Sequence, residues 1–204
     1  EELAGVRCVF GRHDEADLVE ADLVVVSPGI PASAPPVRRA LEAGVEVVGE
    51  LGFASGHLDS VIPLLAITGT NGKSSVTHFT AQLLEAAGRR VFAGGNLGTP
   101  LSEAFGQALD VLVVEVSSYQ MELPGPFAPS AAVVLNLSPD HLARHGTMEV
   151  YAEHKCRVFD RLDAGGFAML PAGDERLERA ARGRGGRRVW LGAQPGATVE
   201  GEEL

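Results

Sequence analysis

The chain contains 204 residues, 45% of them hydrophobic and 5% aromatic, and its formal net charge at pH 7 is −10. This length can form one domain and part of a second, with a sizeable buried core. The negative charge argues against a general nucleic-acid-binding surface, because such surfaces are basic. We interpret the short basic segment at residues 182–188 as a solvated loop between a helix and a strand, not as an RNA-binding tail.

The two cysteines, Cys8 and Cys156, have neither metal-binding nor disulfide-framework spacing, which favours a reducing compartment. The sequence contains no signal peptide and no apolar run of about 18 residues that could cross a membrane. We therefore expect a cytoplasmic protein that does not insert into a membrane.

Short apolar runs alternate with helical patterns at the front of the chain. Strands are predicted at Val6–Phe10, Asp22–Val26 and Val45–Val48, and helices at Ala16–Glu20 and Pro35–Ala43. This alternation is typical of a parallel, Rossmann-like α/β sheet, although no glycine-rich turn precedes the first strand. We therefore interpret residues 1–58 as the end of a Rossmann-like domain. The segment Gly49–Asp59 is expected to be the junction to the next domain.

A phosphate-binding loop is predicted in the segment LLAITGTNGKSSV at residues 64–76. A buried strand at Leu64–Ile67 leads into a glycine-rich turn, and a helical pattern follows at Ser75–Ala87. In this order, backbone amides and the helix N-terminus converge on phosphate oxygens. Lys73 would reach the β- and γ-phosphates of ATP, and the Ser74 hydroxyl would bind Mg²⁺. The predicted cofactor-binding residues are Gly69, Thr70, Asn71, Gly72, Lys73, Ser74 and Ser75.

This loop is shorter than the usual GxxxxGK[ST] pattern. A glycine-rich β-turn before an ordinary helix is therefore the alternative interpretation. The flanking strand and helix favour a nucleoside triphosphate site, because this structural context is what distinguishes the motif.

The remainder of the chain continues the alternation. Strands are predicted at Arg90–Ala93, Val111–Val116, Ala131–Leu135, Phe167–Leu170 and Val189–Leu191. Helices are predicted at Leu101–Ala108, Met148–Leu162 and Glu175–Ala181, and Gln194–Leu204 is expected to be turn-like. The near-continuous apolar strands are typical of a parallel sheet buried on both faces. We predict an α/β fold in which residues 59–204 form a P-loop-type ATPase domain with a mostly parallel sheet.

Polar residues end two of the predicted buried strands. Glu115 ends one of them, and Asp140 and His141 follow the next. Because ligands bind at the carboxyl ends of strands in open α/β sheets, Glu115 could hold Mg²⁺ opposite Ser74. His141 would lie at the same edge and is a candidate metal ligand or proton carrier. A structural glutamate and a surface histidine are the alternatives.

Three further residues, among them Lys155 on the following predicted helix, carry weaker signals. The residues alone favour a solvated side chain for Lys155. His145 and His154 are interpreted as surface residues, as most single histidines are.

The chain resembles the Mur ligase family of peptidoglycan synthesis in five segments with matching order and spacing: ITGTNGKSS, GGNLGTP, VVEVSSYQME, NLSPDHLARHG and YAEHK. The resemblance covers essentially the whole chain, and SPGIP at residues 27–31 is similar to a uridine-side turn of the family. The sequence SSYQ at residues 117–120 is similar to the branch that adds D-glutamate to UDP-N-acetylmuramoyl-L-alanine. The resemblance therefore implies these two compounds as substrates, ATP and Mg²⁺ as cofactors, and a monomer.

The resemblance also implies roles for single residues. Residues 1–58 would be the remnant of a uridine-nucleotide-binding domain. The implied catalytic residues are Lys73, His141 and Lys155, the last matching a lysine that is carbamylated in the family. The implied Mg²⁺ ligands are Ser74, Glu115, His141 and Lys155 as its carbamate. The implied substrate contacts are Ser27, Asn96, Ser117 and Gln120.

One position departs from the family pattern. The family often reads DHxDRH, and this chain has Ala143 in place of the second aspartate. The second metal site would be weaker if that carboxylate orients the histidine, and unchanged if it only caps the loop. We expect the chain to be a fragment of an active ligase. Another Mur-type ligase and a catalytically incomplete ATP-binding module are the alternatives, whereas a P-loop kinase or GTPase would need a longer loop and an aspartate at the second strand.

Overall fold

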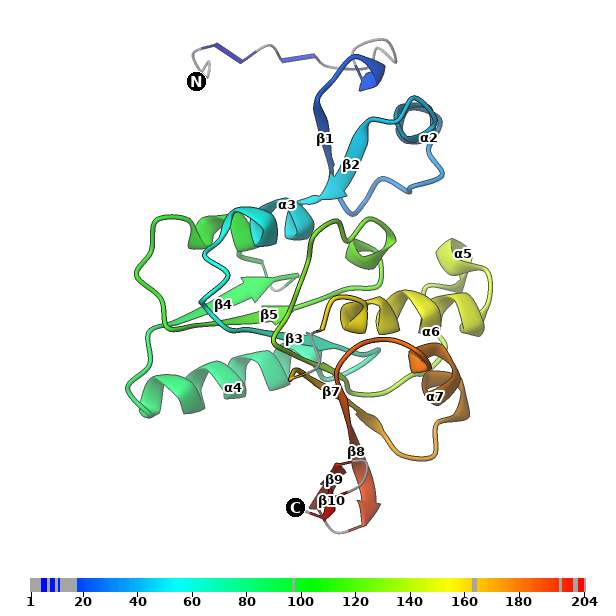
Figure 1. Ribbon diagram of the computed structural model, residues 1–204. Helices are drawn as coiled ribbons and strands as arrows, with labels where there is room; N and C mark the ends of the chain where they lie inside the picture. Colours follow the sequence, from blue (N-terminus) through cyan, green and yellow to red (C-terminus); the bar gives the residue numbers. More distant parts are fainter. Residues whose placement is uncertain are drawn as a thin grey trace.

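The computed structural model describes residues 5, 6, 8, 9, 11, 18–96, 98–162, 165–194, 196–199 and 202–203. The predictions of a strand at residues 6–10 and of a helix at residues 16–20 fall largely outside the described residues. In the part that is described, two sheets follow one another along the chain, a small one at the front and a large one behind it (Figure 1).

The front sheet consists of two parallel strands, β1 (Leu23–Val26) and β2 (Glu46–Gly49). Helix α2 (Pro35–Glu42) connects them and begins with prolines, which suit the first turn because their missing amides would have no helical partner. Val24, Val37 and other apolar side chains from these three elements form a separate small core. The predicted Rossmann-like β–α–β pattern is therefore confirmed over these residues.

The segment between the two sheets, predicted as a junction, contains a helix, α3 (Glu50–His57). Leu51 and Ala54 are fully buried and belong to the core of the large sheet, which is why the segment orders. Gly52 is required by close approach, because a Cβ atom there would lie 2.3 Å from the Pro124 carbonyl oxygen. Tertiary packing, which the local pattern does not reveal, makes this segment helical.

The large sheet has eight strands in the order β10-β9-β8-β7-β6-β3-β5-β4. The strands from β8 to β4 pair in parallel, as predicted, while β9 and β10 are antiparallel. Their bounds are β3 Leu64–Thr68, β4 Val91–Gly95, β5 Val111–Glu115, β6 Ala131–Val134, β7 Phe167–Pro171, β8 Arg187–Gln194, β9 Gly196–Val199 and β10 Glu202–Glu203. The prediction of a turn-like segment at residues 194–204 is wrong for the described residues, because Gly196–Val199 pairs with the free edge of β8 and Glu202–Glu203 pairs with β9.

Helices cover both faces of the large sheet. Alternate residues such as Ala66 and Val114 pack beneath α3, α6 (Met148–Cys156) and α7 (Glu175–Ala181), while Ile67 and Val113 face α4 (Lys73–Ala86) (Figure 1). The shorter helical elements are η1 Leu101–Ala104, η2 Gln120–Glu122, α5 Leu142–His145 and η3 Arg157–Phe159.

Two predicted helices are shorter than expected. The one predicted over residues 101–108 is only the 3₁₀ turn η1, after which Gly106 takes a positive φ of 72°. The one predicted over residues 148–162 ends as an α-helix at Cys156 and continues as η3. Thr147 and Asp174 cap the N-termini of α6 and α7 with their side chains.

The basic segment at residues 182–188 connects α7 to β8, as predicted, with Arg187 and Arg188 already in β8, but it is not simply solvated. Arg184 is only 18% exposed and forms ion pairs with Asp160 and Glu153. None of the helices in the described part of the chain has the length and apolar character needed to span a bilayer.

Candidate active site

The candidate site lies at the carboxyl edge of three central strands. Strand β3 lies between β5 and β6, with Ile67 level with Glu115 and Thr68 level with Val134. The loops that follow these strands therefore meet, and the phosphate loop after β3 lies between the other two. This is the edge at which open α/β sheets bind ligands.

The phosphate loop has the backbone that its sequence predicts. Helix α4 begins at Lys73, directly after Gly72 with a left-handed φ of 83°. Gly69 has a φ of 151°, and a Cβ atom there would lie 3.0 Å from the Leu135 Cβ. The α4 N-terminus, where the first amides of a helix have no partner within the helix and the dipole is positive, is thus exposed at the sheet edge.

Two side chains hold this loop against the loop after β6. Asn136 accepts a hydrogen bond from the Asn71 amide (2.9 Å) and donates one to the Asn71 carbonyl oxygen (3.0 Å). The Thr70 hydroxyl lies 3.2 Å from the Tyr151 hydroxyl and accepts from the Ser138 amide at 3.0 Å. Lys73 Nζ donates to the Thr70 carbonyl oxygen at 2.9 Å, so the lysine folds over the loop.

Glu115 is a buried carboxylate with one oxygen left over. Its side chain is 2% exposed, and Asn96 Nδ2 donates to Oε1 at 2.8 Å. Within the described residues Oε2 is buried and has no hydrogen-bond partner. A buried carboxylate oxygen without a donor is costly, and a bound cation at this position would satisfy it. Asn96, an expected substrate contact, holds Glu115 in this structure.

Lys155 is buried, not solvated, so the interpretation from the residues alone is wrong. It is 1% exposed and its Nζ donates to the Gly69 carbonyl oxygen at 2.7 Å. Nζ also lies 4.5 Å from the centre of the Tyr151 ring. Burial, together with the positive charge of Lys73, lowers the pKa of Lys155 to about 7. A substantial fraction of this amine is therefore unprotonated near neutral pH.

His141 stands at the rim of the site in a strained backbone conformation. Its φ of 52° makes it the one described residue other than glycine with a positive φ. Asp140 accepts from its backbone amide (2.8 Å) and lies 3.2 Å from its Nε2. The Tyr119 ring centre lies 4.9 Å from the imidazole. Ala143 is exposed on α5, so Asp140 is the carboxylate that contacts this histidine.

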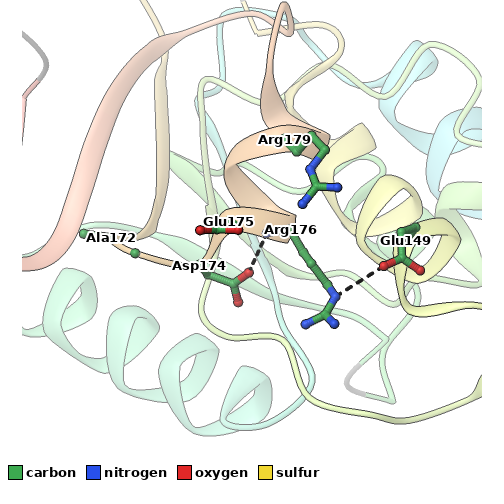
Figure 2. Close-up of a pocket in the computed structure, with 7 residues that line it drawn as sticks. Glu149, Ala172, Asp174, Glu175, Arg176 and Arg179 are labelled. Carbon is green, nitrogen blue, oxygen red and sulfur yellow. Dashed lines mark hydrogen bonds and ion pairs between the residues drawn. The ribbon is translucent and has the colours of Figure 1, made fainter.

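A pocket of about 260 Å³ brings five of the predicted residues together. Lys73, Asn96, Ser117, His141 and Lys155 line it, along with Pro28, Ser118, Tyr119 and Tyr151. Larger hollows lie elsewhere, and Figure 2 shows one of about 530 Å³ between α6 and α7, where Arg176 pairs with Glu149. That hollow contains none of the predicted site residues.

Two of the expected substrate contacts are placed differently. Gln120 is 7% exposed, and its Oε1 accepts from both the amide (2.8 Å) and the hydroxyl (3.0 Å) of Ser117. Gln120 thus shapes the turn that presents Ser117 to the pocket. Ser27 is exposed in the turn after β1, next to Pro28, which reaches the pocket.

The interpretation of His145 and His154 as surface residues is wrong. Two pocket residues, Tyr119 and Tyr151, were not among the residues predicted from the sequence. His145 is 6% exposed and lies 3.0 Å from the Ser118 hydroxyl, and His154 is half-buried. Burial lowers the pKa of both histidines, that of His145 to about 4. Tyr151 precedes Lys155 by one helical turn, a spacing that places both on one face of α6. Tyr119 has no comparable signal in the sequence.

Comparison with known proteins identifies the family. The model of the Mur ligase middle domain matches residues 67–202, and that of the MurD-like N-terminal domain of Mur ligases matches residues 1–49. The chain belongs to the Mur ligase family. It is 42% identical over 204 residues to a UDP-N-acetylmuramoylalanine–D-glutamate ligase of Geobacter metallireducens, covering 98% of this chain and 44% of that protein.

Other relatives in the family give the same picture. A ligase of the same name from Myxococcus xanthus is 46% identical over 180 residues, covering 87% of this chain and 39% of that one. The chain thus spans less than half of the length of the curated relatives it matches.

Solved Mur ligase structures share the fold. A UDP-N-acetylmuramoyl-L-alanyl-D-glutamate–2,6-diaminopimelate ligase superposes with a TM-score of 0.57 at 23% identity, over 86% of this chain and 47% of that one. MurF ligase from Thermotoga maritima in complex with ADP gives 0.54 at 20% identity, over 89% and 52%. The α/β fold with a mostly parallel sheet is therefore that of the family.

Proposed function

We propose that the chain takes part in the ATP-dependent joining of D-glutamate to UDP-N-acetylmuramoyl-L-alanine in peptidoglycan precursor synthesis. The pocket carries this proposal, because it places Lys73 of the phosphate loop beside Lys155, His141 and the turn after Glu115. The relatives named UDP-N-acetylmuramoylalanine–D-glutamate ligase support the choice of substrates. Ser117 to Gln120, which shape one side of the pocket, carry the D-glutamate-type sequence.

The chemistry requires two anions to meet. An oxygen of the alanine carboxylate attacks the γ-phosphorus of ATP, ADP leaves, and an acyl phosphate forms. The D-glutamate amine then attacks the acyl carbon, loses a proton and expels inorganic phosphate. Lys73 and the amides at the start of α4 would stabilise the negative charge on the transferring phosphoryl group.

The residues present fit Mg²⁺. The unpartnered Oε2 of Glu115 and the exposed Ser74 at the start of α4 are oxygen donors of the kind that Mg²⁺ prefers. His141 at the rim would complete a second site. When bound, the metal would neutralise charge on the phosphates and on the attacking carboxylate.

Lys155 fits a modified side chain. Carbamylation requires an unprotonated amine, and a lysine with a pKa of about 7 supplies one. The resulting carbamate would replace a buried cation beside Lys73 with an anion able to support Mg²⁺. We also propose residues 1–58 as a uridine-nucleotide-binding unit, residues 59–204 as the ATPase unit, and a monomer acting in the cytoplasm, where ATP and nucleotide-linked sugars are available.

Phosphate release tests this function. The chain is mixed with Mg-ATP and UDP-N-acetylmuramoyl-L-alanine, and D-glutamate, L-lysine or meso-diaminopimelate is added in separate reactions. Release with D-glutamate alone, abolished in Lys73→Ala, would support the function, and release with another amino acid would contradict the substrate assignment.

Calorimetric titration of the sugar nucleotide and of Mg-ATP provides the second measurement. Binding of both without phosphate release would identify a ligand-binding module that is catalytically incomplete. Failure to bind either would contradict the proposed function.

A further inference from the structure

Glu122 and Arg144 form an ion pair beside Tyr119, which lines the pocket. Arg144 Nε donates to Glu122 Oε1 at 2.7 Å and a terminal nitrogen donates to Oε2 at 2.9 Å, which is the two-pronged geometry of a strong guanidinium–carboxylate pair. The Arg144 side chain is 19% exposed and the Glu122 side chain 10%. Burial raises the pKa of Glu122, but the hydrogen bonds from Arg144 and from the Ala32 amide outweigh it and hold that pKa below its usual value.

Each partner of this pair also binds the front unit. The Ala32 amide donates to Glu122 Oε2 at 3.2 Å, and Arg144 donates to the Gly29 carbonyl oxygen at 3.4 Å. Both contacts fall in the turn at residues 28–32, whose Pro28 lines the candidate pocket. The turn is therefore fixed by side chains that belong to the large domain.

Arg144 also contacts His141, both through the backbone and through the Tyr119 ring. Its own amide donates to the His141 carbonyl oxygen at 2.9 Å, within the short helix α5. Its guanidinium lies 4.9 Å from the centre of the Tyr119 ring, and the same ring packs against the His141 imidazole. A shift of Arg144 would thus move both the backbone and the aromatic support of His141.

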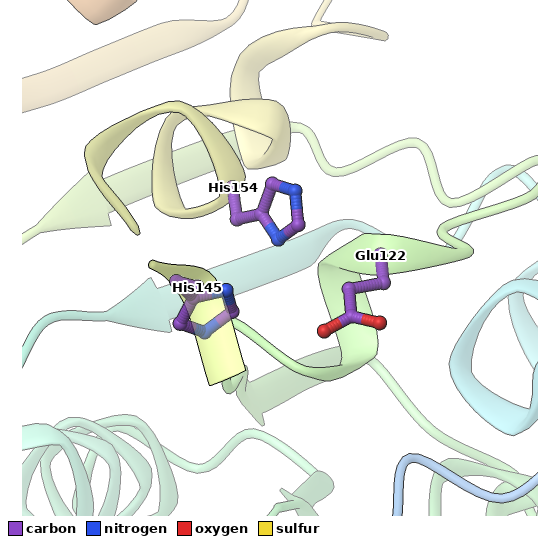
Figure 3. Close-up of side chains that lie close together, drawn as sticks. All are labelled: Glu122, His145 and His154. Carbon is purple, nitrogen blue, oxygen red and sulfur yellow. The ribbon is translucent and has the colours of Figure 1, made fainter. Parts of the chain in front are cut away.

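The neighbouring histidines indicate an alternative role for Glu122, as a metal ligand. Side-chain atoms of Glu122, His145 and His154 lie within 4.8 Å of one another, and Figure 3 shows the three side chains around a common space. Such a set could hold a metal ion. However, both oxygens of Glu122 are already hydrogen-bonded, and positive charge from Arg144 and Arg157 acts on His154. These cations disfavour a metal, and the uncharged histidines pack beside the ion pair instead.

We propose, on the basis of the proposed function, that Glu122 and Arg144 are a positioning pair that makes the turn at residues 28–32 and the geometry of His141 depend on each other. A nucleotide-linked sugar bound against the turn would then order the His141 segment through this pair. Neither residue needs to touch the reacting atoms, since both act through the segments that they join.

Amide hydrogen exchange in three variants tests this proposal. Arg144→Gln removes the charge, Arg144→Lys keeps the charge but not the two-pronged geometry, and Glu122→Gln keeps one acceptor oxygen. Arg176→Gln is the matched control, because Arg176 also forms an arginine–carboxylate pair, with Glu149, but on an exposed surface. The Ala32 amide and the amides of residues 144–146 report on the two segments, and the β3 and α4 amides serve as an internal reference.

We expect Arg144→Gln to speed exchange in both reporting segments by at least about tenfold, because it removes the guanidinium's hydrogen bonds to Glu122 and to the Gly29 carbonyl oxygen, which join the two segments. The two conservative variants should give smaller increases, the reference amides should not change, and Arg176→Gln should match the wild type. Unchanged exchange in the reporting segments, or an equal increase throughout the protein, would overturn the proposal. If Arg144→Gln does not fold, Arg144→Lys and Glu122→Gln decide the question.

A second measurement adds UDP-N-acetylmuramoyl-L-alanine at saturation. In the wild type it should slow exchange at the turn and at residues 144–146, and in Arg144→Gln at the turn alone. Equal protection of both segments in the variant would contradict the coupling. If the wild type does not bind the sugar nucleotide, the proposed function fails, while the comparison without ligand still decides whether the pair joins the two segments.

Discussion

The phosphate loop at residues 69–75 and the buried wall formed by Glu115 and Lys155 serve the same pocket but are built differently. The loop is contiguous in sequence, and Ser74 and Ser75 within it are exposed. The wall comes from two distant segments, and its side chains are 2% and 1% exposed. Changes in the loop should therefore affect ligands with little effect on stability, whereas changes in the wall should affect both. Four predictions follow this contrast, in order of decreasing effect.

The largest effect is expected for Lys155→Met on stability. The folded chain releases the Lys155 proton near pH 7 and the unfolded chain near pH 10.5, so the buried charge lowers the free energy of unfolding most below pH 7. This penalty shrinks as pH rises from 7 towards 10.5. The variant should therefore gain stability relative to the wild type at pH 6, by several kcal/mol less a constant cost for the lost contact with Gly69.

Urea unfolding in carbon-dioxide-free buffer at a series of pH values measures this gain. It should decrease steadily between neutral and alkaline pH, and a gain independent of pH would contradict the assignment. Adding bicarbonate to the wild type should reduce the difference if the amine forms a carbamate.

The second prediction concerns Lys73→Met in the loop. Phosphate release should fall by about 10²- to 10³-fold, because a preorganised donor to the transferring phosphoryl group is lost. The free energy of unfolding should change by less than about 1 kcal/mol, since Lys73 is only half-buried and donates to a carbonyl in its own loop. A loss of activity explained entirely by unfolding at the assay temperature would contradict the expectation that changes in the loop have little effect on stability.

The third prediction is that a change at Glu115 impairs Mg²⁺ binding more than a change at Asn96, which hydrogen-bonds to Glu115. Asn96→Ala should raise the Mg²⁺ concentration needed for ATP binding by about 10- to 100-fold, which is the usual cost of losing a residue that orients a metal ligand. Glu115→Gln should raise this concentration further. It should leave the metal-free protein no less stable, because a buried charge is removed. Calorimetric ATP titrations at several Mg²⁺ concentrations test the order, and the reverse order would count against Glu115 as a ligand.

The smallest effects are expected for the two neighbouring serines of the loop. Ser74→Ala should raise the Mg²⁺ concentration needed for ATP binding, because the hydroxyl at this helix position is the predicted ligand. Ser75→Ala, one position further along the same loop and equally exposed, should change it by less than about twofold, since Ser75 is not a predicted Mg²⁺ ligand and alanine keeps the backbone amide that would bind phosphate. An equal change in this Mg²⁺ concentration for the two variants would contradict the prediction that Ser74 is the Mg²⁺ ligand.

Much of the fold could be predicted because its signals are local. Glycine at positions 69 and 72, between an apolar strand and a helix, predicted the phosphate loop, and strand–helix alternation predicted the parallel sheet. The helix at residues 50–57 and the β9–β10 hairpin could not be predicted in the same way. The first is fixed by Leu51 in a distant core, and the second by the free edge of β8.

The sequence by itself determined the phosphate loop and, through the family motifs, the residues expected around it. Only the tertiary structure decided the state of those residues. Burial makes Lys155 a weakly basic amine and leaves Glu115 with an unsatisfied oxygen, and folding joins Arg144 to the turn of the front unit. These properties depend on solvent exclusion and on neighbours from distant segments, so no local pattern of residue types contains them.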